Sequence, residues 1–257
     1  MKNFKHIISI TVLTVILFSS TSANAQWWKK ALADAGGALG GAGSVASISS
    51  VFSLTPPGLV ALGGGAVVGG AAASVVVSGS DSSAQAAEAF QAGEQATKGG
   101  RSSGQYRNAS KSTSSGNSIG ELHNQAIIEY FDNYTTFNKD TFYTFLTSNP
   151  KYGLNDEIKF SKNDYNAIVQ ESIHLRSPGS TKLIEFILKH IPPTVDNQRF
   201  RDYLILLLNS TASLSEFKAQ IDTIEELTKT ENDMTKLDSL IMDSFFSTLR
   251  HSSDFWH

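Results

Sequence analysis

The sequence predicts an all-α protein in which a Gly/Ala-rich helical hairpin and a flexible linker precede a C-terminal bundle of about six helices. Three observations predict this fold class. No charged residue lies between Asp34 and Asp81, and Gly, Ala, Ser and Val dominate that stretch. A polar segment rich in Gly and Ser follows it, as expected of a linker. The remainder of the chain carries apolar residues at helical spacing.

Residues 1–25 have the three parts of a secretory signal peptide. Two lysines near the start precede the apolar run Ile7–Phe18, and Ala23 and Ala25 occupy the small-residue positions of a cleavage site. We expect cleavage after Ala25, so that the mature chain begins at Gln26; the alternative is an uncleaved membrane anchor. The protein is therefore expected to be exported, and to be periplasmic, membrane-associated or secreted.

The expected mature chain starts with a group of aromatic and basic residues. Trp27 and Trp28 are followed directly by Lys29 and Lys30. Indole rings and lysine ammonium groups both settle at the boundary between lipid and water, so these four residues are candidate interface anchors. The alternative is that the two indoles pack on the folded protein.

The region 26–80 is predicted to form a hairpin of two helices, separated by the sequence Thr55-Pro56-Pro57-Gly58. Small residues recur four apart in both halves, and such residues share one helix face. Small faces allow two helix backbones to approach closely. The residues predicted to pack the hairpin in this way are Gly36, Gly40, Gly65, Gly69 and Ala73; Ala33, Gly37 and Gly41 form a neighbouring row.

Each half of the hairpin exceeds the ~20 residues that cross a bilayer core. Glycine costs about 1 kcal/mol relative to Ala inside a helix, so these Gly-rich helices would not persist alone in water. We expect residues 32–79 to contact a membrane, with self-association as a further possibility. Three alternatives remain open: a flexible linker, burial against the rest of the protein, and valine-rich strands.

Residues 81–117 are predicted to form a short helix followed by a Gly/Ser linker. The part of the mature chain up to residue 117 carries a slight excess of basic residues, whereas residues 118–257 are clearly acidic. An acidic domain does not attract a polyanion, so no nucleic-acid partner is expected.

Residues 118–257 are predicted to form a helical domain that folds without the hairpin. Ser161 with Asp164, and Ser213 with Glu216, have the spacing of helix caps. The run Leu204–Leu208 is apolar on every helical face, which predicts a helix at the centre of the bundle and a severe effect of Leu206→Asp. The expected helices follow the apolar positions of Ile119–Phe131, Tyr165–Ile173, Leu183–Leu188, Phe200–Leu208, Phe217–Leu227 and Met234–Leu249.

The sequence assigns no catalytic, cofactor-binding or metal-binding residue. It has no cysteine, and common nucleotide, metalloprotease and hydrolase motifs are missing. His123 is a candidate base or ligand, but a lone histidine more often has a packing or capping role. His251, Asp254 and His257 cluster at the end of the chain, which is a poor rigid frame for a metal ion. An enzyme is therefore possible but unsupported, and no cofactor is expected.

Two partial resemblances accompany these patterns. The stretch from Gly36 to Ser80 is similar to the glycine-zipper segments of bacteriocins and other membrane-active bacterial peptides. The segments Ile119–Asn124 and Arg250–Trp256 resemble parts of uncharacterised exported helical proteins from Bacteroidetes-type bacteria. The second resemblance implies an exported helical protein and names no catalytic residue.

Two functional hypotheses follow from the sequence. The first is an exported protein that is held at a membrane by a glycine-zipper hairpin and binds an unidentified ligand or protein through its helical domain. The alternative is a secreted, bacteriocin-like toxin or pore former whose hairpin inserts into a target membrane. The two differ in whether the mature protein stays with the producing cell's membranes or appears in the medium.

Overall fold

The structure, a computed structural model, describes residues 27–48, 55–77, 117–134, 136–152, 160–175, 180–209 and 213–257. Nine α-helices and one 3-10 turn occur in these ranges, and none of the described residues forms a strand, so the all-α prediction is confirmed. The predicted signal peptide with Ala23, Ala25 and Gln26 lies outside the described residues. So do the predicted helix and linker between residues 81 and 116.

The two halves of the Gly/Ala-rich region form helices α2 (Trp27–Ile48) and α3 (Pro56–Val77). They run antiparallel: Gly41 faces Gly65, and Gly37, one turn earlier, faces Gly69, one turn later. Thr55 precedes the first helical residue of α3, and a proline at that first position needs no backbone N–H. Pro56, Pro57 and Gly58 of the predicted break thus form the first turn of α3, and α2 ends at Ile48.

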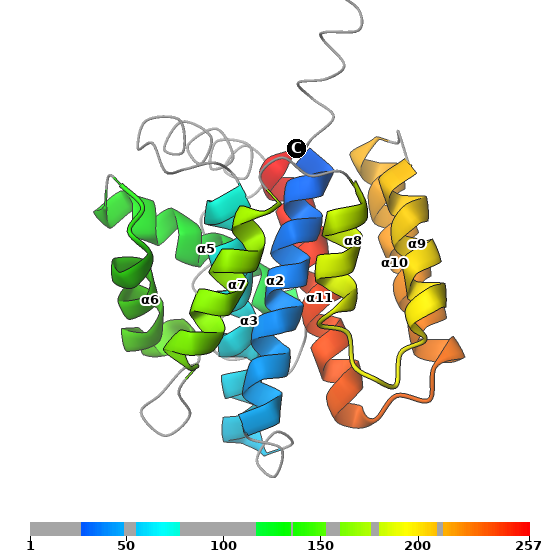
Figure 1. Ribbon diagram of the computed structural model, residues 1–257, viewed down its shortest axis with the longest axis horizontal. Helices are drawn as coiled ribbons and strands as arrows, with labels where there is room; N and C mark the ends of the chain where they lie inside the picture. Colours follow the sequence, from blue (N-terminus) through cyan, green and yellow to red (C-terminus); the bar gives the residue numbers. More distant parts are fainter. Residues whose placement is uncertain are drawn as a thin grey trace, which may run out of the picture.

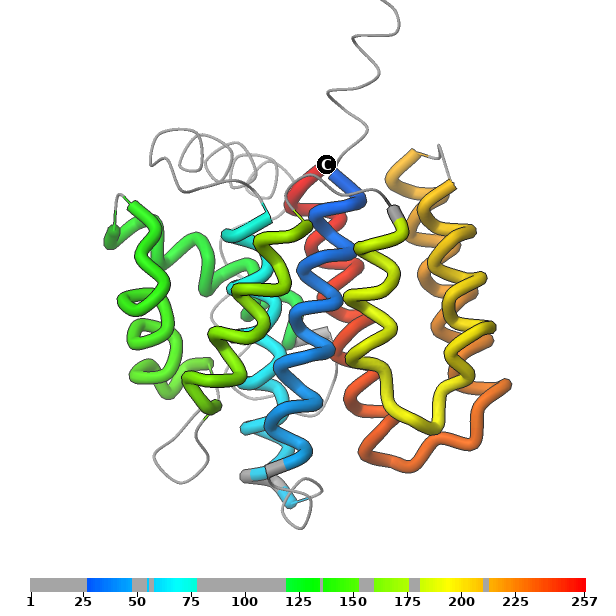
Figure 2. Tube along the Cα trace, viewed as in Figure 1, coloured from blue at the N-terminus to red at the C-terminus, as the bar shows by residue number. Residues whose placement is uncertain are grey.

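This hairpin lies in the middle of the bundle, with the other helices around it (Figure 1). Helices α5 (Asn117–Asn133), α6 (Lys139–Ser148) and α7 (Lys162–Ile173), with the 3-10 turn η2 (Pro150–Tyr152), cover one side. The second side is formed by α8 (Ser180–Leu188), α9 (Asn197–Asn209) and α10 (Leu214–Glu231). The last helix, α11 (Lys236–Trp256), packs along α2, and its end meets the start of α2 (Figure 2).

Side-chain caps fix where several of these helices begin. Ser161 accepts a hydrogen bond from the backbone N–H of Asp164 at 3.1 Å, at the start of α7. Ser213 and Glu216 form a reciprocal capping box at the start of α10. Both predicted caps are confirmed, and Thr235 with Asp238 makes a second capping box at the start of α11.

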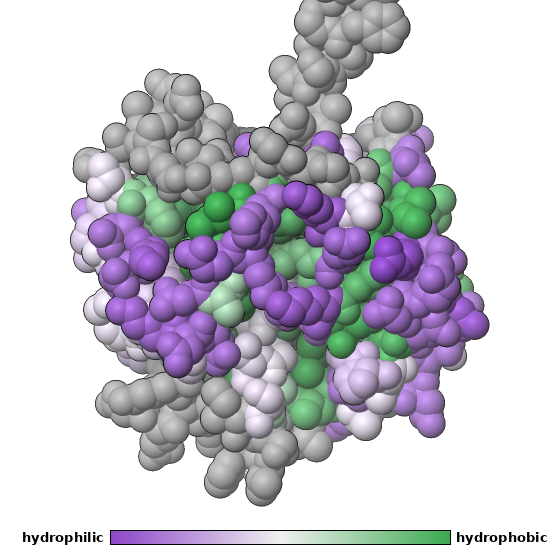
Figure 3. Space-filling view, in the orientation of Figure 1, coloured by the Kyte–Doolittle hydropathy of each residue, from purple (hydrophilic) through white to green (hydrophobic). Residues whose placement is uncertain are grey.

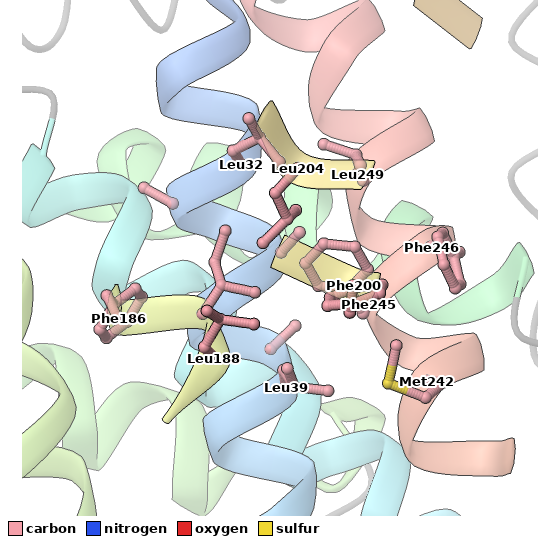
Figure 4. Packing of buried hydrophobic residues seen from close by; sticks show 14 of the residues in the cluster. Leu32, Leu39, Phe186, Leu188, Phe200, Leu204, Met242, Phe245, Phe246 and Leu249 are labelled. Carbon is pink, nitrogen blue, oxygen red and sulfur yellow. The ribbon is translucent and has the colours of Figure 1, made fainter. Parts of the chain in front are cut away.

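Two apolar clusters fill the interior, and each contains part of the hairpin. The first joins α2 to α8, α9, α10 and α11, with Leu32 and Leu39 of α2 packed among aromatic and aliphatic side chains (Figure 4). The second joins α3 to α5, α6 and α7, with Val67 and Val68 of α3 among its fully buried members. The helices after residue 117 thus share their interior with the hairpin, and both clusters would lose their centre without α2 and α3.

The prediction that the apolar run of α9 forms the centre of the bundle is wrong. Leu204 and Leu207 are fully buried, but Ile205 is 39% exposed and Leu206 is 56% exposed. Helix α9 lies at the edge of the bundle and packs through one face only (Figure 1). The buried residues Phe200, Leu204 and Leu207 follow the four- and seven-residue spacing of a single helix face.

The visible surface carries both polar and apolar residues. Among the coloured residues of the space-filling view, hydrophilic ones extend across the middle of the face, and hydrophobic surface shows between them (Figure 3). Among the described helices, α3 is the most apolar, and most of its residues are buried.

Candidate functional site: a buried polar cluster on the hairpin

Glycines on facing sides of α2 and α3 bring the two backbones into direct contact. An added Cβ at Gly41 would lie 2.0 Å from the carbonyl oxygen of Gly65, and one at Gly69 would lie 2.2 Å from that of Gly37. No side chain fits at such distances without moving a backbone. A Cβ at Gly37 would also lie 2.6 Å from the Cβ of Ala73. Of the residues predicted to pack the hairpin, Gly65, Gly69 and Ala73 thus lie on the contact between its two halves.

Gly36 and Gly40 lie on a different face of α2. A Cβ at Gly36 would come within 2.8 Å of the Phe186 ring of α8, and a Cβ at Gly40 would lie 3.3 Å from the ring of His190. The neighbouring row with Gly37 and Gly41 makes the contact with α3 instead. Helix α2 therefore carries small residues on two faces, one that contacts α3 and one that contacts α8 and the residues just after it.

Helix α3 has the length and composition of a membrane-spanning helix. Residues Gly58–Val77 have a mean hydropathy of 2.0, and most of them are buried inside the protein. A buried helix of a soluble bundle meets the same criteria. The structure therefore places a candidate span inside a protein interior.

The four candidate interface anchors all contact protein. The Trp27 ring packs edge-on against Phe217, with ring centroids 5.0 Å apart, and against the ring of His257 at 5.2 Å. Lys29 lies over the ring of Trp28 at 5.2 Å, and Lys30 lies over the ring of Trp256 at 4.4 Å. All four residues are half-buried, so part of each side chain still meets solvent.

Asp34, the last charged residue before the uncharged stretch, is fully buried. One of its oxygens, Oδ2, accepts a hydrogen bond from the indole N–H of Trp256 at 2.7 Å. The other oxygen, Oδ1, has no hydrogen-bond partner among the described residues. Burial raises the pKa of this carboxyl to about 7, and Trp256, the hydroxyls of Ser74 and Ser252, and the charge of Lys30 oppose that rise. Asp34 therefore changes charge near neutral pH.

His123 of α5 is the second fully buried titratable group on the hairpin. Its ring packs on the backbone of α3, because a Cβ added at Gly70 would lie 2.8 Å from Cδ2 of the imidazole. Its Nδ1 lies 2.9 Å from Oδ1 of Asn124, and the amide nitrogen of Asn124 donates to the carbonyl of His251 at 3.1 Å. That second bond orients Asn124 with its oxygen toward His123, so Nδ1 of His123 carries the proton.

The remaining ring nitrogen of His123, Nε2, is buried without a hydrogen-bond partner among the described residues. Burial lowers the pKa of His123 to about 4, and the nearby His251 lowers it further, against the hydrogen bond to Asn124 and the backbone of Gly70. The imidazole is thus neutral at pH 7.

Polar contacts between α5 and α11 complete the cluster. The backbone N–H of Gly120 donates to Oγ of Ser247 at 3.2 Å. Nδ1 of His251 donates to the carbonyl of Ser247 at 2.8 Å, and its Nε2 lies 3.7 Å from the carboxylate of Glu121. These contacts set α5 and the end of α11 side by side over the hairpin.

The three residues considered for a terminal metal site point to different partners. His251 contacts Ser247 and Glu121, whereas Asp254 pairs with Lys218 and His257 packs on Trp27. No group of three potential metal ligands occurs among the described residues.

The sequence identified His123 as a candidate but offered no partner for it, and it did not single out Asp34 or Trp256 at all. The position of Asp34 in the sequence was the signal that could have identified it. Asp34 is the last charged residue before the long uncharged stretch, and a buried carboxyl there needs a partner. Its partner is 222 residues away along the chain, so only the fold identifies it. Because Asp34, Ser74, His123 and Ser252 are all fully buried, a substrate has no access to them in this state. The cluster can exchange protons and hold helices together.

Comparison of the chain with models of protein families, with curated proteins and with solved structures finds no match. The functional argument therefore rests on the sequence and on this geometry.

Proposed function

We propose that this is an exported, membrane-inserting protein whose helical bundle stores the α2–α3 hairpin and releases it into a lipid bilayer. The observation that carries the proposal is α3 itself, an uncharged helix of membrane-spanning length that occupies the centre of the bundle. The predicted signal peptide and the bacteriocin-like character of the hairpin sequence support the same function.

The composition of the hairpin suits two environments. Its many glycines make it a weak helix in water, so it needs either protein or lipid around it to stay helical. The contact through Gly37, Gly41, Gly65 and Gly69 involves only α2 and α3. It can therefore persist when the surrounding helices are exchanged for lipid, because small faces of this kind also pack helices in membranes.

Burial favours a stored hairpin over a permanent tether. A hairpin fixed in a membrane would remove α2 and α3 from both apolar clusters, leave α7, α8 and α11 without their main partner, and take from α5 one of its two main partners. A folded bundle and an inserted hairpin are therefore alternative states of one chain. The interior that the hairpin shares with the other helices therefore favours the membrane-active hypothesis over the anchored binding protein.

A crosslink that holds α3 in the bundle tests the proposal. The chain has no cysteine, so Gly63→Cys with Ile119→Cys introduces a single pair, at positions where an added Cβ on Gly63 lies 3.6 Å from the Ile119 side chain. We expect the reduced protein to release dye from phospholipid vesicles and the oxidised protein to be inactive. The same preparation thus provides its own control. Equal dye release in the two redox states, or none in either, contradicts the proposed function.

A further inference from the structure

We propose that Asp34, Trp256 and His123 form a polar clasp that keeps the hairpin inside the bundle, and that proton exchange at this clasp sets when the hairpin is released. The inference rests on the proposed function, because it names the control of the same hairpin. Its physical basis is a set of contacts between helices that are distant in sequence, made around the fully buried side chains of Asp34 and His123.

The first half of the clasp joins α2 to the end of α11. The indole N–H of Trp256 donates to the Asp34 carboxyl at 2.7 Å, and the ammonium group of Lys30 lies over the same indole ring at 4.4 Å. Trp256 is thus held by α2 from two positions one turn apart. If the end of α11 moves away, the carboxyl of Asp34 loses the hydrogen bond from the indole of Trp256.

The second half joins α5 to α3. The His123 ring fills the space above Gly70, where any side chain larger than hydrogen would collide with it. Gly70 also faces the carbonyl of Asp34, since an added Cβ there would lie 3.2 Å from that oxygen. One glycine of α3 therefore adjoins both halves of the clasp. His123 contributes a neutral, buried ring that fits against this glycine.

Several charged or titratable groups face the clasp from the surrounding helices. Lys30 of α2 faces Asp34 and raises the tendency of its carboxyl to ionise, and the hydrogen bond of His123 to Asn124 of α5 opposes the lowering of the imidazole's pKa by burial. From α11, His251 faces His123, and Glu121 of α5 in turn lies near His251. The groups that α3 and α11 present to Asp34 are the hydroxyls of Ser74 and Ser252, which carry no charge.

The two buried groups respond to pH in opposite directions. The folded protein holds the pKa of His123 at about 4, below its ordinary value of 6.5, so the neutral ring favours folding and this contribution is lost as the pH falls from about 6.5 to 4. The pKa of Asp34 is about 7 in the folded protein and 3.8 otherwise, so burial of the neutral acid favours folding at low pH. That contribution is lost as the pH rises from about 4 to 7.

Between about pH 4 and 6.5 the pH dependences of the two contributions therefore cancel. Opening the clasp releases a proton from Asp34 and takes one up at His123, so the net proton exchange is close to zero. Removing either group should leave the other uncompensated. The geometry then predicts that a single neutral substitution converts a pH-insensitive clasp into a pH-controlled one.

A thiol probe on α3 measures opening without a membrane. Val75 is a buried residue of α3, and in this cysteine-free chain Val75→Cys provides a unique thiol. Its rate of alkylation, divided by the rate for the urea-unfolded protein at the same pH, reports how often the hairpin is exposed. This normalisation removes the intrinsic pH dependence of the thiol.

The first comparison removes the hydrogen bond of the clasp. In the Val75→Cys background at pH 7, we expect Trp256→Phe to raise normalised labelling about tenfold or more, because the buried carboxyl loses its donor. Trp28→Phe is the matched control: it also replaces a half-buried indole near the start of α2, but one that lies beside Lys29. Equal effects of the two substitutions would overturn the assignment of Trp256 to the clasp.

The second comparison tests proton exchange. We expect Asp34→Asn to gain acid sensitivity, with labelling relative to the parent rising about tenfold per pH unit, or about 300-fold from pH 6.5 to 4. His123→Gln should show the mirror image, with labelling relative to the parent rising as the pH increases from 4 to 6.5. Ratios to the parent cancel the contribution of all other carboxylates. Parallel pH profiles for the parent and both variants would overturn the proposal, whatever their absolute rates.

The two proposals fail in distinguishable ways. If labelling follows the predicted pattern but no variant releases dye from vesicles, the clasp exists and the membrane function is wrong. If the reduced cysteine pair releases dye while labelling is insensitive to Trp256→Phe, Asp34→Asn and His123→Gln, the function stands and the clasp is wrong.

Discussion

Helices α3 and α9 both carry a run of apolar residues, but they differ in how much of that run is buried. Protein surrounds α3, whereas α9 buries one face and leaves Leu206 56% exposed. The difference lies in the size of the side chains. Small residues on α3 allow α2 to reach its backbone, so other helices can gather closely around the pair. The leucines of α9 keep neighbours at side-chain distance and suit a helix at the edge.

The contacts between helices differ in the same way. Backbone meets backbone between α2 and α3, through Gly41 and Gly65. Side-chain tips join α9 to α10, where Arg199 lies 3.3 Å from Glu231 and Tyr203 donates to the same carboxylate at 2.5 Å. Partly exposed ion pairs of this kind contribute about 0–1 kcal/mol, whereas close packing in the interior tolerates almost no change. The hairpin should therefore be the sensitive region and the α9–α10 edge the tolerant one.

The largest expected effect is that of removing the hairpin. A truncated chain that begins at Asn117 keeps every helix around the hairpin but loses its share of both apolar clusters. We expect it to unfold without a cooperative thermal transition and to bind a dye that reports exposed apolar surface. Circular dichroism during heating is the measurement, with the mature chain as the control. A cooperative transition in the truncated chain would instead support the independent domain that its sequence predicts.

Alanine substitutions of single glycines should distinguish the face on which α2 and α3 touch from a face with open space beside it. Gly69→Ala places a Cβ 2.2 Å from the carbonyl oxygen of Gly37, and we expect it to lower the free energy of unfolding by about 2–4 kcal/mol. The matched control is Gly43→Ala, because a Cβ there meets nothing within 4 Å. It should stabilise the protein by up to about 1 kcal/mol through its higher helix propensity. Urea unfolding measures both, and a loss of stability in Gly43→Ala equal to that in Gly69→Ala would refute the contact.

The sequence predicted local structure better than it predicted partners. Helical spacing and the caps at Ser161 and Ser213 appear in the structure because they depend on residues within one turn. The centre of the bundle could not be predicted in this way. Gly36 and Gly37 belong to rows of equally small residues on adjacent faces of α2, and spacing alone does not say which row meets α3. The clasp was harder still to predict, since Asp34 and Trp256 meet only through the fold.

The smallest effect should come from Leu206, the residue that the sequence marked as one of the most sensitive. Its side chain is more than half exposed, so Leu206→Asp leaves the new carboxylate in water and avoids the burial of a charge. Aspartate has lower helix propensity than leucine, and a negative charge near the end of a helix is mildly unfavourable, which together cost about 1 kcal/mol or less.

The neighbouring residue sharpens the test, because Leu207 lies on the same turn of α9 and is fully buried in the cluster shared with α2. Leu207→Asp makes the identical chemical change and should cost more than about 4 kcal/mol, since it places an unpaired carboxylate among apolar side chains. The difference between the two midpoints in urea then measures burial alone, because helix propensity and the terminal charge effect are nearly the same at adjacent positions. Similar midpoints for the two variants would mean that α9 does not pack through the face that holds Leu204 and Leu207.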